Sequence, residues 1–230
     1  MHHTLCTALF VLLANVLFSQ NNESKLGYWL MGFNQTRFHK NWSLHSEIQY
    51  RSYEVLPNTE QLLLRGGINY HINSEHSVTA GYGRIHNHAF DKDANPGIQV
   101  SENRIWQQYL MLNNISRVFF QHRYRIEQRW LKTEHSSNYL NRFRYFLRVS
   151  VPINNAELKA KTLYLTLYDE IFIHIDEQPF DRNRLYGALG FRWTSMLSIE
   201  VGYLAQTTAT TQHLLQTAVF YNIDFRKRDK

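Results

Sequence analysis

The residues best placed to do chemistry in this sequence are arginines and glutamates that recur at every second position. In "QHRYRIEQRW" (121–130) the charged series is Arg123, Arg125, Glu127 and Arg129. Charges that repeat with a period of two lie on one face of an extended strand, so they point into a common space. Because arginine outnumbers glutamate, such a face can pair its charges internally and also bind anions.

The same spacing recurs along the chain, and we predict that all these side chains face one interior. The predicted lumen charge cluster comprises Arg51, Arg65, Arg123, Arg125, Glu127, Arg129, Arg142, Arg144, Arg148, Glu170, Arg184 and Arg192, with Glu47 and Glu200 beside them. Paired across strands, these charges would plug a narrow lumen, since unpaired buried charge is costly. The arginine excess alternatively favours a small anion, passing through a narrow pore or held as a ligand. The plug is the preferred interpretation, because small barrels leave little free lumen.

Histidine next to serine is a second chemical pattern, and it would suit an acyl hydrolase. It occurs as "HSE" (45–47) and as "HS" at 76–77 and 135–136. Neighbouring residues on a strand point to opposite sides, whereas a nucleophile and its base must lie on one side within hydrogen-bond reach. We therefore predict a protein that is not an enzyme, with an outer-membrane lipid-modifying hydrolase as the alternative.

Metal binding is the third chemistry that the sequence allows. In "RIHNHAF" (84–90), His86 and His88 share one face of a strand and have donors for zinc or copper. Asp91 and Asp93 are near in sequence, but no clear third ligand follows. A polar strand end entering a loop is the better interpretation, so we expect no metal and no other cofactor.

The segment "YDEIF" (168–172) places two acids side by side. Glu170 would face the arginines of a neighbouring strand, and a structural ion pair is the simplest role for it. Asp169 would then point outward, which indicates a bulge or a position near a membrane interface.

The bulk composition fits a folded domain with a basic interior. The chain has 230 residues, 43% of them hydrophobic and 14% aromatic, and a formal charge of +6. A basic balance can indicate nucleic acid, anionic lipid or a basic interior. The arginines are spread over many strands and the basic tail "RKRDK" (226–230) is short. We therefore expect no nucleic-acid partner.

The N-terminus has the pattern of a secretory signal peptide. The run "LCTALFVLLANVLF" (5–18) is apolar and leads into polar residues, so we assign 1–20 to the signal and 21–230 to a single domain. Cys6 is the only cysteine, so the mature chain has no disulfide and no thiolate site. No other run approaches the ~20 apolar residues that a membrane-spanning helix needs.

Period-two alternation predicts an all-β protein. Strands are expected at 26–37, 42–54, 60–71, 76–89, 103–112, 117–131, 139–151, 158–174, 183–193, 197–207 and 212–225. Short and long connections alternate, which is typical of an antiparallel up-and-down barrel. This reading gives 11 strands, but bacterial outer-membrane barrels have even numbers. We therefore predict about 12 strands, with 10 as the alternative, and look for the missing strand at 90–103.

Each strand has one apolar and one polar face, and two kinds of barrel differ in which of these faces points outward. A soluble barrel turns its apolar face inward, whereas a membrane barrel turns it toward lipid. The export signal, the arginine-rich polar face and the aromatic residues near strand ends favour a transmembrane barrel. Those aromatics are Trp29, Trp42, Trp106, Trp130, Trp193, Tyr221 and Phe225. A soluble periplasmic barrel that binds an apolar ligand is the other alternative.

The mature chain resembles a family of uncharacterised outer-membrane β-barrel proteins of Bacteroidetes-type bacteria, the domain-of-unknown-function family 2490. The resemblance rests on residues 27–51, "QHRYRIEQRW" (121–130), "NRFRYFLRVSVPI" (141–153), "LYDEIFI" (167–173) and 180–204, in that order. It implies the outer membrane of a Gram-negative bacterium, with outer-membrane lipid and the outer-membrane insertion machinery as partners. It implies no activity. The chain departs from many such barrels in that Phe225 is followed by five further residues.

Overall fold

The chain forms a single closed sheet of strands. The computed structural model describes residues 26–55, 58–90, 97–175 and 178–226. The predicted signal peptide (1–20) and Asp91 and Asp93 lie outside these residues. The strands are β1 (Gly27–Arg37), β2 (Trp42–Ser52), β3 (Thr59–His71), β4 (His76–His88), β5 (Ile98–Ile115), β6 (Val118–Lys132), β7 (Ser137–Pro152), β8 (Thr162–His174), β9 (Phe180–Arg192), β10 (Leu197–Thr207) and β11 (Thr211–Asp224).

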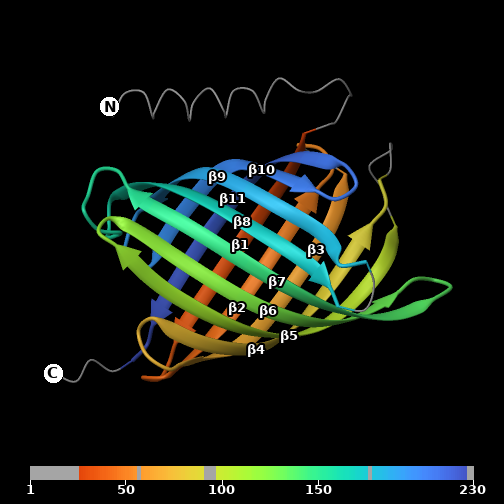
Figure 1. Cartoon of the computed structure of the whole chain (residues 1–230), viewed down its shortest axis with the longest axis horizontal. Coiled ribbons are helices and arrows are strands. Elements are labelled where there is room, and N and C mark those ends of the chain that lie inside the picture. The colour runs from red at the N-terminus through yellow and green to blue at the C-terminus, as the bar shows by residue number, and fades with distance from the viewer. Residues whose placement is uncertain (1–25, 56–57, 91–96, 176–177, 227–230) are drawn as a thin grey trace.

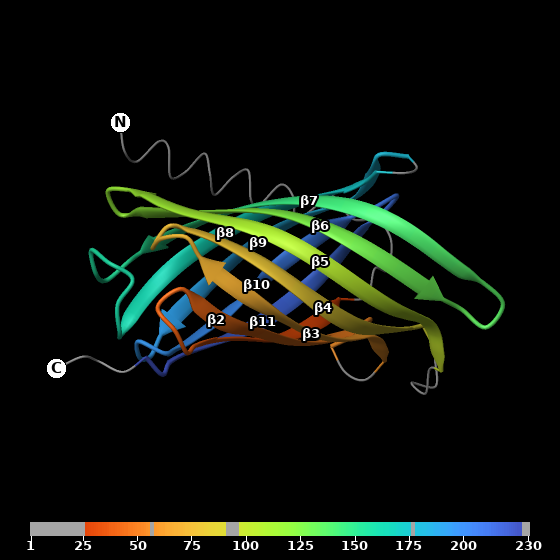
Figure 2. The ribbon, with the colours of Figure 1, turned by 90° about the horizontal axis from the view of Figure 1, so that it is seen from below.

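These strands confirm the all-β barrel, and every one coincides with a predicted segment. Each follows its neighbour in sequence and pairs with it antiparallel, from β1 to β11 (Figures 1 and 2). The last strand then returns to the first, and β1 pairs β11 in parallel, from Gly27 opposite Leu214 to Arg37 opposite Asp224. An up-and-down barrel closes in parallel when its strand number is odd, because the first and last strands then run the same way.

The expected number of about 12 strands, or 10, is corrected by this closure. The described residues contain 11 strands, which is the number that the alternation itself indicates. Residues 98–103, where a missing strand was sought, belong to the beginning of β5. The error came from imposing the even number of bacterial barrels on a sequence whose pattern contradicted it.

The connections separate the barrel into two ends. One end, called the short-turn end here, carries the connections 38–41, 72–75, 116–117, 153–161 and 193–196. The other end, called the long-loop end, carries 53–58, 89–97, 133–136, 175–179 and 208–210. The connection after β7 is longer than the sequence pattern suggested, whereas Ser116 takes a left-handed φ of 54° in a two-residue turn.

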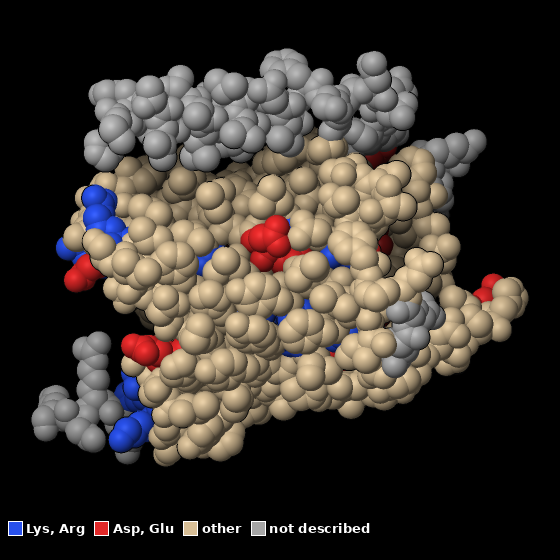
Figure 3. All heavy atoms as spheres, viewed as in Figure 1, with Lys and Arg blue, Asp and Glu red and all other residues tan. Residues whose placement is uncertain are grey.

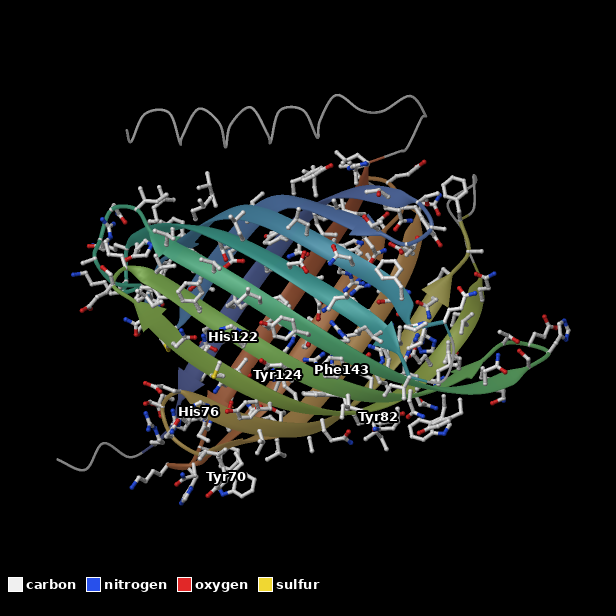
Figure 4. All side chains as sticks on the ribbon, viewed as in Figure 1. Tyr70, His76, Tyr82, His122, Tyr124 and Phe143 are labelled. Atoms are coloured by element: carbon white, nitrogen blue, oxygen red, sulfur yellow. The ribbon has the colours of Figure 1, made fainter. Side chains whose placement is uncertain are left out.

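The outer wall of the barrel is apolar. Ile48, Leu64, Leu185 and Val201 project outward from the middle of their strands and are more than half exposed. Tyr82 and Tyr124 project from the same wall (Figure 4). On the face in Figure 3 most of the surface is neither acidic nor basic: charged side chains gather mainly at the left end, and the middle shows one acidic patch and blue atoms visible between neutral side chains. This is the inverse of a soluble barrel, whose outer wall is polar.

Trp29 and Trp106 occupy the interior, which corrects their assignment to an aromatic girdle. Both are fully buried, whereas Trp42, Trp130 and Trp193 are at least 40% exposed, as a girdle requires. Trp106 fits inside because Gly81 leaves its space free: a Cβ there would collide with the Trp106 ring and with the carbonyl oxygen of Gly66. The glycine opposite Trp106 thus allows this ring to face the lumen.

Candidate functional site in the barrel lumen

The lumen collects the charged residues that the alternation placed on one face. Buried there are Arg51, Arg65, Arg125, Glu127, Arg129, Arg142, Arg144, Glu170 and Arg184, with Glu47 and Glu200. Arg123 and Arg148 join them with side chains that are 17% and 16% exposed. Arg192 lies apart at the short-turn end, where its guanidinium donates to the carbonyl oxygens of Leu158 and Ser195 at 2.7 and 3.0 Å.

Four further members of the cluster were missed, namely Glu102, Arg104, Asp181 and Arg182, which pairs with Asp181 at 3.0 Å. Glu102 and Arg104 are buried in the lumen on β5, and Asp181 accepts from Arg142 at 2.7 Å. Glu102, Arg104 and Trp106 form one alternating series, so the signal was present in the sequence. Glu102 was overlooked because the strand was expected to begin at residue 103, whereas Arg104 lies inside the expected strand and was omitted from its polar face.

Glu127 is the centre of the cluster. Its carboxylate is fully buried and lies 2.6 Å from both Arg142 Nη2 and Arg144 Nη1. Arg104 Nη1 approaches to 3.3 Å, and Nη1 of Arg65 and of Arg125 each lie at 3.8 Å. The strand register explains this arrangement: Glu127 pairs directly with Arg142 and Trp106, so residues of β5 and β7 surround it.

Further carboxylates extend the contacts to other strands. Glu170 accepts from Arg123 at 2.5 Å and Arg144 at 2.6 Å. Glu102 accepts hydrogen bonds from both Nε and Nη2 of Arg129 at 2.8 Å. This bidentate pair fixes the carboxylate and the guanidinium relative to each other. Because each acid reaches arginines of other strands, the network ties opposite parts of the wall together across the lumen.

Positive charge exceeds negative charge in this network. Ion pairs within 4.0 Å link nine arginines, namely Arg65, Arg104, Arg123, Arg125, Arg129, Arg142, Arg144, Arg182 and Arg184. They share five carboxylates among the described residues, namely Glu47, Glu102, Glu127, Glu170 and Asp181. Arginine does not lose its proton in proteins, so the interior carries a net positive charge.

The opposite side of the lumen is apolar. β1, β9, β10 and β11 contribute a buried cluster of Trp29, Met31, Tyr186, Ala188, Leu204, Leu214 and Ala218, and Phe33, Tyr168 and Phe220 pack against it. Between the two sides lies a cavity of about 720 Å³, lined by residues from both ends of the barrel. The interior therefore combines a cationic wall with an aromatic wall.

The structure brings serine and histidine together at places that the sequence pattern did not show. In "HSE" (45–47), His45 and Glu47 point inward and lie 3.2 Å apart, while Ser46 lies on the other face. Ser43 Oγ instead lies 2.8 Å from His71 Nε2 in the lumen, and Ser101 Oγ lies 3.3 Å from His86 Nδ1 on the outer wall. Both contacts join neighbouring strands, so only the register reveals them.

Neither serine–histidine contact has the surroundings of a catalytic base. The charged neighbours of His71 are Arg37 and Arg226, and those of His86 are Arg84 and His88. A general base becomes positively charged in the reaction, and neighbouring cations oppose this step. The lumen contact is also part of an amide cluster, because Ser43 Oγ accepts from Asn69 at 2.9 Å.

Metal-binding geometry is absent from the described residues, in which no three His, Cys, Asp or Glu side chains gather at a possible metal position. His86 and His88 project from the end of β4 near the long-loop end. Within the same residues, no helix has the length and hydropathy of a membrane span.

A closed β-barrel with an apolar outer wall and an arginine-rich lumen is the class of protein that these features define. The chain belongs to the family described as protein of unknown function (DUF2490), whose model matches residues 26–217. No curated protein and no solved structure matches the chain significantly.

Proposed function

We propose that the protein is a non-catalytic β-barrel of the outer membrane of a Gram-negative bacterium, whose lumen is closed by its Arg/Glu network. The observation that carries the proposal is the inverted barrel: apolar side chains cover the outside and charges fill the inside. A closed barrel satisfies all of its backbone hydrogen bonds between strands, which the lipid core requires. Outer-membrane lipid and the insertion machinery are the partners that this location implies.

The outward polar side chains support a lipid environment, because many of them pair with one another. His76 Nδ1 lies 2.7 Å from the Tyr109 hydroxyl, and His122 Nδ1 lies 2.9 Å from that of Tyr145. His76, His122 and Tyr124 lie on neighbouring parts of the wall (Figure 4). A polar group without water needs such a partner, whereas one on a soluble protein does not.

The side-chain amides of the wall follow the same rule. Gln107 and Gln128 exchange two hydrogen bonds of 3.2 Å across β5 and β6. Asp169 accepts from Asn183 at 2.9 Å, without a bulge at this position. The bulge expected near Asp169 lies instead between Phe172 and Ile173.

Closure of the lumen follows from the position of Glu127. Arginines from β3, β5, β6 and β7 converge on this one carboxylate. Opening a path through it would separate buried ion pairs and leave charges without partners, at a cost of about 3–5 kcal/mol for each broken pair. The network therefore acts as a permanent structural plug.

A narrow anion-selective pore is the second candidate, favoured by the cavity that residues from both ends of the barrel line. The excess of arginine would give such a pore its selectivity. Single-channel recording on the protein refolded into a planar bilayer decides between the two. We expect no discrete conductance. Anion-selective conductance steps that disappear in Arg123→Glu would contradict the closed lumen and support the pore.

Membrane insertion itself is tested by fractionation and by gel mobility. We expect the protein in the outer-membrane fraction after carbonate extraction, with an unheated band that migrates differently from the boiled one. Release with the periplasmic contents would contradict the proposal and favour the soluble barrel with an apolar ligand. The same fraction provides the folded sample for the conductance measurement.

The lipid-hydrolase alternative rests on the contact between Ser101 and His86 on the outer wall. We expect no release of fatty acid when the folded protein is incubated with phospholipid vesicles. Release that is abolished in Ser101→Ala and retained in the matched variant Ser46→Ala would establish the enzyme instead.

A further inference from the structure

The cationic wall of the lumen holds hydrogen-bond donors that have no acceptor. Nε and Nη1 of Arg65, Nη1 of Arg125 and Nε of Arg123 are buried and make no hydrogen bond within the described residues. The side chains of Arg65 and Arg125 are only 4% and 2% exposed. All three line the cavity. Buried donors without partners cost free energy, so the site favours a ligand that supplies acceptors.

Trp106 adds a further donor to this group. Its ring lies under Arg125, 4.6 Å from the guanidinium carbon, and 5.6 Å from that of Arg65. The indole Nε1 is buried and likewise makes no hydrogen bond in the described part of the chain. The rings and guanidinium groups fix one another by stacking, so the donors are positioned before any ligand arrives.

The local charge points to an anion. Arg125 has three cations nearby, Arg65, Arg123 and Arg144. The carboxylate of Glu127, which would offset them, is 3.8 Å away. Among the residues that the structure describes, the only acceptor within hydrogen-bond distance of the Arg125 guanidinium is the neutral side chain of Gln108, at 2.6 and 3.1 Å. Since these arginines cannot deprotonate, a bound anion is the means of compensating their charge.

An apolar surface begins beside these donors. The guanidinium of Arg123 stacks 4.3 Å above Phe146, whose ring centre is 4.9 Å from that of Tyr168. Phe33 and Phe220 stack in parallel at 5.0 Å and line the same cavity. A ligand that places an anionic group on the arginines can therefore lay an apolar body against these rings.

We propose that the lumen binds a small organic carboxylate, with its carboxylate on Arg65, Arg123 and Arg125 and its apolar body against Phe33, Phe146 and Phe220. The planar guanidinium groups match the two oxygens of a carboxylate. The site requires the closed barrel but not the membrane, so this proposal can be tested independently of the proposed outer-membrane location.

Calorimetric titration of the full chain, refolded in detergent, tests the site with benzoate as the probe. Benzyl alcohol has the same ring without the charge, and inorganic phosphate has the charge without the ring. We expect benzoate to bind at least about tenfold more tightly than either. Arg125→Gln should weaken benzoate binding by at least about tenfold, and the exposed control Arg226→Gln should leave it unchanged.

The outcomes separate the proposal from its competitors. No binding of benzoate to folded protein, or equal binding by benzyl alcohol or phosphate, overturns it. Unchanged binding in folded Arg125→Gln overturns the assigned position. Should Arg125→Gln fail to fold, Arg123→Gln serves the same purpose, because Arg144 still holds Glu170 at 2.6 Å in that variant.

Discussion

Arg125 lies directly opposite Arg144 in the pairing of β6 with β7. Like charges at facing positions destabilise a sheet, so this pair persists only because of what surrounds it. Arg144 is held by both Glu127 and Glu170 at 2.6 Å, whereas Arg125 has only a distant carboxylate. Arg125 is therefore the less compensated cation of this pair. The same residue provides one of the unpaired donors of the proposed carboxylate site, so a cation that weakens the sheet pairing would be a binding residue.

Glu127→Gln is expected to destabilise the barrel severely. The change removes the charge that Arg142 and Arg144 both contact at 2.6 Å and leaves each buried cation with one carboxylate, Asp181 for Arg142 and Glu170 for Arg144. We expect a loss of about 3–5 kcal/mol in the free energy of unfolding. Urea unfolding in lipid vesicles measures it, with the exposed loop variant Glu134→Gln as the control. A midpoint equal to that of the control would show that Glu127 does not hold the network together.

Gly190→Ala is expected to disturb the packing of Tyr164. A Cβ at position 190 would collide with the Tyr164 ring and its hydroxyl, which donates to Glu200 at 2.8 Å. Overpacking of this kind costs about 1–3 kcal/mol. The loss should largely disappear in a Tyr164→Ala background, which removes the ring. Gly97→Ala is the control, because a Cβ there meets nothing within 4 Å. Equal losses in both backgrounds would place the collision elsewhere.

Val201→Arg distinguishes a lipid-facing wall from a water-facing one. Val201 is 58% exposed in the middle of β10, between Leu189 and Thr217. In a bilayer the charge should cost about 2–4 kcal/mol of unfolding free energy. On a soluble barrel it would cost little and improve solubility. Unfolding from vesicles measures the effect, and Val201→Ile, which stays apolar, should behave like the natural chain.

Asp169→Asn tests the one carboxylate pointing outward from the middle of β8. Asp169 lies between Leu147 and Leu185 and accepts from Asn183. The amide keeps an acceptor for Asn183 and removes the charge, so we expect a gain below about 2 kcal/mol in vesicles. An unchanged or lower unfolding midpoint would mean that the carboxylate is solvated or binds a cation. Asp224→Asn, at the end of β11, is the matched control.

The local parts of this fold were predictable because a strand records its two faces in its own sequence. The alternation in β6 and β7 placed Arg125, Glu127 and Arg144 on one face without knowledge of any neighbour. Strand ends were predictable where polar turn residues follow directly. β5 begins earlier than expected because Ile98 and Val100 already alternate with polar residues, although they directly follow a polar stretch that was assigned to a loop.

Features that depend on two strands were beyond the sequence. The contact of Ser43 with His71 needs the register of β2 with β3. The inward position of Trp106 needs Gly81 on the facing strand. Closure is the extreme case, since the pairing of β1 with β11 joins residues about as far apart in sequence as the barrel allows. Periodicity determines the face of a residue, whereas register determines its partner.

The parallel closure has a consequence for compartments. A barrel with an even number of strands returns its chain to the side from which it entered, but here β1 begins at the long-loop end and β11 finishes at the short-turn end. If the wall spans a membrane, Gly27 and Asp224 open into different aqueous spaces. A partner fused before the first strand and one fused after the last would be kept apart by the lipid. The folded chain would thus connect two environments covalently, even with its lumen closed.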